Sequence, residues 1–309
     1  MYILIIGNFP EETREKIRNA FPKEWTVTIT EPKNVSSFLQ VAEVVVPEHF
    51  KVDEQFLGSA PKLRMIQTGS GFDNVDLAAC RKRGIQVFSA PGVNAAAVAE
   101  HVMALMLSWY KNIPYLDSFM KSHRDEKELD YAGGELAGKT IGIIGTGHIG
   151  KKVASLCSIF DMNVLGYSRK KTADSVIEMT ELDDLLRRSD IITVHVPLTE
   201  ESREMIGMAE LAKMKKSALL INTSRGAVIE ENALIDALRK GQIAGACLDV
   251  FTEEPLSQES PLRDMKNVIL TPHTAGLPDG VKYHAKRYQY FVNNIKRFME
   301  EQGETELIE

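Results

Sequence analysis

Apolar and polar positions in the first ninety residues alternate in short runs that predict strands separated by helices. Strand-like runs cover residues 2–6, 26–30, 43–46, 65–68 and 86–88. Helical periodicity marks the intervening segments 11–20 and 75–83. This alternation predicts a parallel sheet with helices on its faces. A first α/β unit therefore extends to about Asn94, which can cap the long apolar helix that follows to residue 110.

A second α/β unit begins at residue 139, after a charged arm at 112–136 that is either a solvated connection or a subunit contact. Its further strands are predicted at 163–167, 191–195, 218–221, 244–250 and 268–271. The last helix, 280–300, is amphipathic and could pack on either unit. We predict the α/β fold class, with two doubly wound parallel sheets.

Composition changes this picture little. A chain of 309 residues is longer than single cores usually grow, and 44% hydrophobic with 26% charged residues is typical of a globular enzyme. A net charge of -6 without a basic block argues against nucleic acid as the main partner. The N-terminal apolar run lacks a basic leader and no stretch predicts a membrane span, so we expect a cytoplasmic protein. The apolar surroundings of Cys80, Cys157 and Cys247 predict reduced core thiols, and we expect no metal site.

The segment KTIGIIGTGHIG, residues 139–150, is the strongest functional signal. An apolar strand leads directly into Gly145, Gly147 and Gly150, and a helix and a second strand follow. Glycines at this spacing permit a sharp turn, a close approach to a pyrophosphate and tight helix packing. We predict a dinucleotide site made by Gly145, Thr146, Gly147, His148, Ile149 and Gly150.

Cofactor choice is indicated by Ser168, which lies where NAD-preferring sites place an acid, 168 - 145 = 23 residues beyond the first glycine. Arg169 and Lys170 follow it, and Asp161 lies at the wrong end of the strand. A hydroxyl and an arginine can hold a 2′-phosphate, so we predict a preference for NADP(H). A solvated basic turn, with NAD or dual use, stays the alternative.

Three polar residues follow predicted strands: Arg225, Glu254 and His273. Singly, each is commonplace as a surface cation, a loop carboxylate or a hydrogen-bonded histidine. Together they supply a cation for a carboxylate, an imidazole to move a proton and an acid to orient it, which reduction of a 2-oxo acid requires.

The chain resembles the D-isomer specific 2-hydroxyacid dehydrogenases, the family of glyoxylate, hydroxypyruvate and phosphoglycerate dehydrogenases. The resemblance rests on PKLRMIQTGSGFDNVDLAACRKRGI, NAAAVAEHVMALML, GKTIGIIGTGHIGKKVA, HVPLTEESREMI, LINTSRGAVIEENALIDALRKGQIAGACLDVFTEEP and NVILTPHTAG. It implies a Rossmann domain at 97–275, inserted in a flavodoxin-like substrate domain formed by 1–96 and 276–309. It also implies a homodimer.

The resemblance further assigns roles to individual residues. Arg225, Glu254 and His273 become the catalytic triad, in which His273 protonates the carbonyl oxygen while the nicotinamide delivers hydride. The amides of Ser70 and Gly71 join Arg225 in holding the substrate carboxylate. Additional cofactor contacts are implied for His195, Pro197, Thr199, Thr223 and Asp249, the last near the nicotinamide carboxamide.

The chain also departs from the family. The arm has no tryptophan where many members carry one, and Leu277 and Pro278 replace a polar turn after His273. Glu48 and His49 lie in the loop expected to meet the far end of the substrate, although either can equally face solvent. A carboxylate there disfavours a phosphorylated substrate such as 3-phosphoglycerate.

We therefore expect an NADP(H)-dependent reductase of a small 2-oxo acid, of the glyoxylate or hydroxypyruvate type. Two alternatives stay open: a dinucleotide-sensing regulatory protein on the same fold, and an NAD-dependent D-3-phosphoglycerate-type dehydrogenase.

Overall fold

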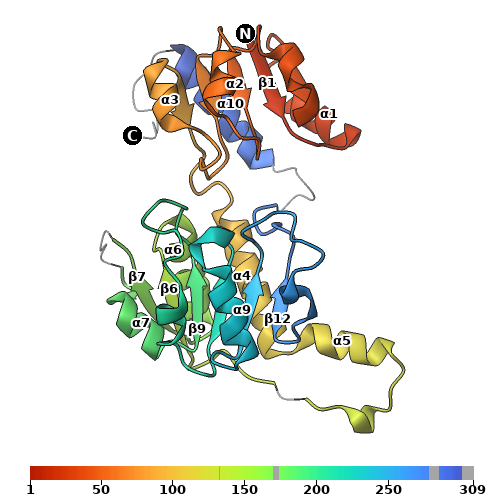
Figure 1. Cartoon of the computed structure of the whole chain (residues 1–309), viewed down its shortest axis with the longest axis vertical. Helices are drawn as coiled ribbons and strands as arrows, with labels where there is room; N and C mark the ends of the chain where they lie inside the picture. Colours follow the sequence, from red (N-terminus) through yellow and green to blue (C-terminus); the bar gives the residue numbers. More distant parts are fainter. Residues whose placement is uncertain (132, 170–173, 278–284, 301–309) are drawn as a thin grey trace. The chain divides into compact units, whose positions relative to one another are not determined.

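The computed structural model describes residues 1–131, 133–169, 174–277 and 285–300 (Figure 1). The chain divides into two compact units, one formed by Met1–Asn94 with Leu277–Glu309 and the other by Ala95–Gly276. Each unit contains a parallel sheet with helices packed on it, so the predicted fold class is confirmed.

The described part of the first unit forms a five-stranded parallel sheet in the order β2-β1-β3-β4-β5. Its strands are β1 (Tyr2–Ile6), β2 (Thr26–Thr30), β3 (Val44–Val46), β4 (Met65–Gln67) and β5 (Gln86–Phe88). Its helices are α1 (Glu11–Ala20), α2 (Glu54–Gly58), α3 (Leu77–Lys82) and α10 (Ala285–Glu300), with a 3-10 turn at Pro32–Phe38. Successive side chains of β1 point to opposite faces, so Leu4 and Ile6 pack with α2 and α3, while Ile3 and Ile5 pack with α1 and α10.

Helix α10 belongs to the first unit although the whole second unit separates it from β5 in sequence. Its residues Tyr288, Phe291 and Ile295 are fully buried in the same apolar cluster as Ile3 and Ile5. In Figure 1 the blue helix α10 lies among the red and orange elements of this unit. The sequence left open which unit the last helix packs on, and the structure shows that it packs on the sheet of the first unit.

The described part of the second unit forms a seven-stranded parallel sheet in the order β12-β11-β10-β9-β6-β7-β8. Its strands are β6 (Thr140–Ile144), β7 (Asn163–Tyr167), β8 (Glu178–Met179), β9 (Ile191–Val194), β10 (Leu219–Asn222), β11 (Gly245–Leu248) and β12 (Val268–Leu270). Its helices are α4 (Ala95–Tyr110), α5 (Ile113–Lys121), α6 (His148–Ile159), α7 (Leu182–Arg188), α8 (Met208–Leu211) and α9 (Glu231–Arg239), with 3-10 turns at Glu126–Glu128, Gly226–Val228 and Pro261–Asp264.

Strand order reverses at β6, which has β7 on one side and β9 on the other. Helices α4 and α6 cover one face of this sheet, and α7 and α9 cover the other. Open parallel sheets bind ligands where the order reverses, beyond the carboxyl ends of the strands. The glycine loop directly follows β6 and therefore lies at that point.

Within the arm, Ile113–Lys121 forms helix α5, an element that the sequence analysis did not predict. Phe119 is 3% exposed and anchors the helix, while Ile113 and Met120 are 53% and 58% exposed. Exposed apolar side chains of this kind are typical of interaction surfaces. A subunit contact through the arm stays a prediction.

The three cysteines are buried free thiols. Burial raises the pKa of Cys80 to about 11 and that of Cys157 to about 12.

Among the described residues, no group of three or more His, Cys, Asp or Glu is arranged to hold a metal. In the same part of the chain, no helix is long and apolar enough to cross a membrane.

Candidate active site

The three predicted catalytic residues follow three adjacent strands of the second sheet. Arg225 comes after β10, Glu254 after β11 and His273 after β12, and these strands are neighbours in the order β12-β11-β10. Because the strands are parallel, their carboxyl ends lie along one edge of the sheet. The fold therefore places all three loops on the edge that also carries the glycine loop.

His273 and Glu254 form a direct pair. The imidazole Nδ1 lies 2.7 Å from Glu254 Oε2, and the side chains are 32% and 35% exposed. The other carboxylate oxygen of Glu254 accepts a hydrogen bond from the Phe251 backbone N–H at 3.0 Å. A carboxylate held at Nδ1 fixes the ring orientation and directs Nε2 away from itself.

Asp249 holds the loop on which His273 lies. Its carboxylate is fully buried and accepts hydrogen bonds from the Thr271 hydroxyl at 2.6 Å and from the backbone N–H groups of Thr274 and Ala275 at 2.9 and 3.0 Å. The His273 backbone, with φ of 53° in the left-handed region, donates to the Asp249 carbonyl at 2.8 Å. The resemblance implies a cofactor contact for Asp249, and its bonds here show that it also positions the loop.

Arg225 lies on a loop that a buried asparagine organises. The Asn222 amide donates to the Arg225 carbonyl at 2.8 Å, and its oxygen accepts from the Ser224 N–H and hydroxyl at 3.0 and 2.8 Å. A Cβ at the next residue, Gly226, would lie 1.9 Å from the carbonyl carbon of Phe251. Since Phe251 also bonds Glu254, the arginine loop rests directly on the segment that holds the catalytic pair. Sequence reasoning missed Asn222, whose only signal is an asparagine at the end of an otherwise apolar strand.

Each glycine of the nucleotide loop shows the steric property that a dinucleotide site needs. Gly145 has φ of 97°, and a Cβ there would lie 2.5 Å from the His195 carbonyl oxygen. A Cβ on Gly150 would lie 2.1 Å from the Gly145 carbonyl oxygen, so α6 packs tightly against the turn. A Cβ on Gly147 would meet nothing within 4 Å, which leaves its backbone open to a ligand. This cradle, at the N-terminus of α6, fits a pyrophosphate.

Two buried polar atoms at the same edge have no partner among the described residues: Thr223 Oγ1 and His195 Nδ1. The other ring nitrogen of His195 bonds the Thr193 hydroxyl at 3.0 Å, and burial lowers the pKa of His195 to about 3. The ring is therefore neutral at physiological pH. Buried polar atoms without a partner are costly unless a ligand or water satisfies them, so both fit contacts to a bound cofactor.

Ser168 and Arg169 follow β7, as the NADP(H) prediction requires, but the arginine has a partner that the sequence analysis missed. Its Nη1 lies 2.9 Å from Glu201 Oε2, and the two side chains are 70% and 72% exposed. Thr199 bonds the same carboxylate oxygen at 3.2 Å. Lys170 lies outside the described residues.

Residues 103–275, more than half of the chain, match the family described as "D-isomer specific 2-hydroxyacid dehydrogenase, NAD binding domain". The chain belongs to this family. Its members are nicotinamide-dependent oxidoreductases that act on CH–OH groups. The matched segment contains the glycine loop and all three residues of the triad, so the site described above lies in the dinucleotide-binding part of the dehydrogenase.

Two curated relatives illustrate the range of the family. The dehydrogenase is 41% identical to a glyoxylate reductase from Thermococcus litoralis over 285 residues, which is 88% of this chain and 86% of the relative. It is 37% identical to a D-3-phosphoglycerate dehydrogenase from Archaeoglobus fulgidus over 281 residues, 89% of this chain. The match spans only 53% of that protein, so the chain covers about half the length of this phosphoglycerate dehydrogenase.

Solved structures show the same fold with either cofactor. A D-lactate dehydrogenase from Aquifex aeolicus, complexed with NAD and lactic acid, has a TM-score of 0.83 and 31% identity, with 97% of this chain and 96% of that chain covered. An acyclic imino acid reductase in complex with NADPH and D-Arg has a TM-score of 0.87 and 26% identity, with both chains fully covered. The dehydrogenase therefore binds a nicotinamide dinucleotide, and the fold alone does not choose between the two forms.

Candidate substrate residues of the first unit lie in loops after its strands. Ser70 and Gly71 follow β4, and the Ser70 hydroxyl bonds the Asn94 side chain at 2.9 Å. Their contact with a substrate carboxylate stays a prediction. Leu277 is half-buried, and Pro278 lies outside the described residues.

Glu48 has partners within the first unit. Its carboxylate forms a hydrogen-bonded ion pair with Arg287 and accepts a bond from the Tyr288 hydroxyl at 3.0 Å. Because Arg287 neutralises it, the negative charge of Glu48 does not disfavour a phosphorylated substrate, contrary to the sequence prediction. His49 is exposed, and its role in substrate choice stays a prediction.

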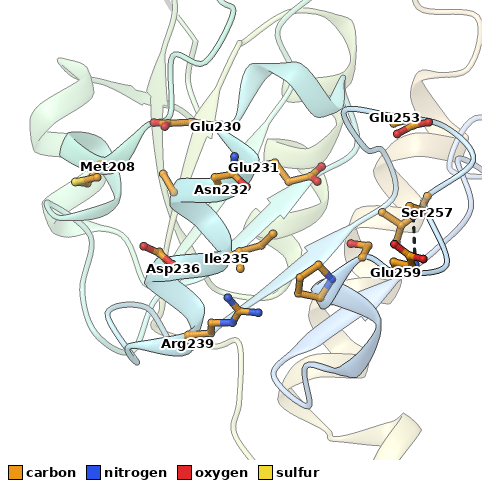
Figure 2. A pocket seen from close by; sticks show the side chains of 14 residues that line it. Met208, Glu230, Glu231, Asn232, Ile235, Asp236, Arg239, Glu253, Ser257 and Glu259 are labelled. Atoms are coloured by element: carbon orange, nitrogen blue, oxygen red, sulfur yellow. Dashed lines mark hydrogen bonds between the residues drawn. The ribbon is translucent and has the colours of Figure 1, made fainter.

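A hollow of about 540 Å³ lies between α9 and the loop at 253–261 (Figure 2). None of the triad residues lines it. Its charged lining residues are Glu230, Glu231, Asp236, Arg239, Glu253 and Glu259. Five carboxylates against one guanidinium repel an anion, so this hollow does not suit a 2-oxo acid.

Proposed function

We propose that the protein reduces a small 2-oxo acid, of the glyoxylate or hydroxypyruvate type, to the D-2-hydroxy acid with NADPH. The observation that carries the proposal is the pair of His273 and Glu254, whose Nδ1 and Oε2 atoms lie 2.7 Å apart. The pair lies beside the loop that carries Arg225, at the carboxyl ends of the strands of the NAD binding domain. The 41% identity to a glyoxylate reductase along most of both chains supports this substrate class.

The mechanism follows from the three side chains. The Arg225 guanidinium binds the substrate carboxylate and sets the position of the adjacent carbonyl. His273, held at Nδ1 by Glu254, donates its Nε2 proton to the carbonyl oxygen, which becomes the hydroxyl of the product. When bound, the reduced nicotinamide supplies the hydride for the carbonyl carbon. The glycine loop, Thr223 and His195 are the groups that would hold the dinucleotide.

The preference for NADPH rests on Ser168 and Arg169. No acid occupies position 168, so nothing on β7 repels a 2′-phosphate, and an arginine fork can bind it. A structural relative with NADPH bound supports the use of this form within the fold.

The test is a turnover assay with NADPH and NADH on glyoxylate, hydroxypyruvate, 3-phosphohydroxypyruvate and pyruvate. His273→Ala should lower kcat about 100- to 10,000-fold, the usual contribution of a positioned acid, with dinucleotide affinity unchanged. His123→Ala is a matched control, since His123 is an exposed loop histidine in the arm with the same left-handed backbone, φ 55° against 53°. A wild-type protein that binds dinucleotide but turns over none of these acids would instead indicate the regulatory alternative.

A further inference from the structure

The ion pair between Arg169 and Glu201 joins the loops on either side of the glycine turn. Arg169 follows β7 and Glu201 lies in the loop after β9, while the glycine loop leaves β6, the strand between them. The strand ends at this turn are bonded directly: Gly145 N–H donates to the carbonyl of Tyr167, the last residue of β7, at 2.8 Å, and His195 N–H, just after β9, donates to the carbonyl of Ile144, the last residue of β6, at 2.7 Å. The pair therefore lies beside the place where a dinucleotide would bind.

Glu201 is presented by an ordered turn. The Thr199 N–H donates to the Ser202 hydroxyl at 2.8 Å, and that hydroxyl donates to the Pro197 carbonyl at 2.7 Å. Ser202 is only 9% exposed, so these bonds fix the backbone on both sides of Glu201. The Thr199 hydroxyl also bonds the carboxylate oxygen that meets Arg169. The position of this carboxylate is thus set by the loop as well as by its charge partner.

We propose that Glu201 sets the cofactor preference, acting as the acid that β7 lacks; this inference rests on the proposed use of a nicotinamide dinucleotide at the glycine loop. A 2′-phosphate that binds Arg169 must displace Glu201 from it and also meets the negative charge of Glu201. A free 2′-hydroxyl instead can donate a hydrogen bond to that carboxylate, as it does to the acid of NAD-preferring sites. Glu201 thereby restrains the preference for NADPH and preserves the use of NADH.

A purely structural role for the pair makes a different prediction. Exposed ion pairs contribute little to stability, so loss of this one should then change neither the thermal midpoint nor the ratio of the two dinucleotide affinities. A specificity role should instead change the two dinucleotide affinities in opposite directions.

The experiment measures the Kd of NADPH and of NADH by calorimetry, without substrate, for the wild type, Glu201→Gln and Glu200→Gln. Glu200 is an exposed neighbour, so its variant removes the same charge one residue away. We expect Glu201→Gln to tighten NADPH binding about three- to tenfold, the effect of one carboxylate close to a phosphate in screened solvent. It should weaken NADH binding, and the gain for NADPH should shrink in high salt and in an Arg169→Ala background.

Two negative results have different meanings. If the wild type binds both dinucleotides and the ratio of their Kd values is the same in Glu201→Gln as in Glu200→Gln, the role of Glu201 is refuted while the proposed function stands. If the wild type binds neither dinucleotide, the proposed function itself fails.

Discussion

The buried ion pair of the first unit gives the sharpest stability prediction. Arg287 and Glu48 have side chains that are only 16% and 11% exposed, and the guanidinium carbon lies 5.3 Å from the centre of the Phe291 ring. Burial lowers the pKa of Arg287 from its ordinary value, yet the guanidinium stays charged at neutral pH. Glu48→Ala would leave this cation in an apolar cluster without its counter-charge.

The expected cost follows from the exposure of the pair. Removal of one partner from a fully buried ion pair costs about 3–5 kcal/mol, and water reaches this pair to a small extent, so we expect about 3 kcal/mol. Loss of the bond from the Tyr288 hydroxyl is included in that figure. Urea unfolding can measure it in a Trp109→Phe background, where Trp25 of the first unit is the remaining tryptophan.

Two further variants make the measurement decisive. Glu54→Ala removes an acid of the same unit whose partner Arg83 is exposed, with side-chain exposures of 61% and 38%, and should cost less than about 1 kcal/mol. Glu48→Ala combined with Arg287→Met should be more stable than Glu48→Ala alone, because no unpaired charge is left. A Glu48→Ala variant as stable as Glu54→Ala, with an altered ranking of 2-oxo acids, would refute the argument and favour a substrate role.

Two predictions concern the catalytic edge. Gly226→Ala places a Cβ 1.9 Å from the Phe251 carbonyl carbon, so the loop that carries Arg225 must shift. In steady-state assays kcat/KM should therefore fall about 100-fold or more. A near-normal kcat/KM would show that the loop adapts to the added methyl group. Glu254→Ala removes the acceptor that holds the imidazole at Nδ1, so the ring loses its orientation and kcat should fall about 100-fold in the same assays. An unchanged kcat would mean that other contacts orient the ring.

The sequence predicted the sheets well because many of their strands have apolar side chains on both faces. Strand β1, for example, is central and covered on each side, so its apolar run is continuous from residue 2 to 6 and has the predicted bounds. The three candidate catalytic residues were found for a related reason, because each of them follows such a run. Chain order alone then places the three residues along one edge.

What the sequence did not predict depends on contacts between distant residues. Helix α5 is only nine residues long, contains Pro114, starts after Asn112 with φ of 54° and has Phe119 as its single buried residue, so little packing against the rest of the chain marks it. The partners of Arg169 and Glu48 lie 32 and 239 residues away, and a charged residue leaves no periodic trace of its partner. The buried bonds that hold the catalytic loops are hidden for the same reason.

Helix α10 has a consequence for the order of folding during synthesis. The last strand of the first sheet ends at Phe88 and α10 begins at Ala285, 285 - 88 = 197 residues later. At about 5–20 residues per second, the ribosome needs roughly 10–40 s to make that interval, which contains the whole second unit, Ala95–Gly276. During this time Ile3, Ile5 and Phe88 lack the helix that covers them. Before α10 is made, the first unit thus exposes apolar surface that a chaperone can bind.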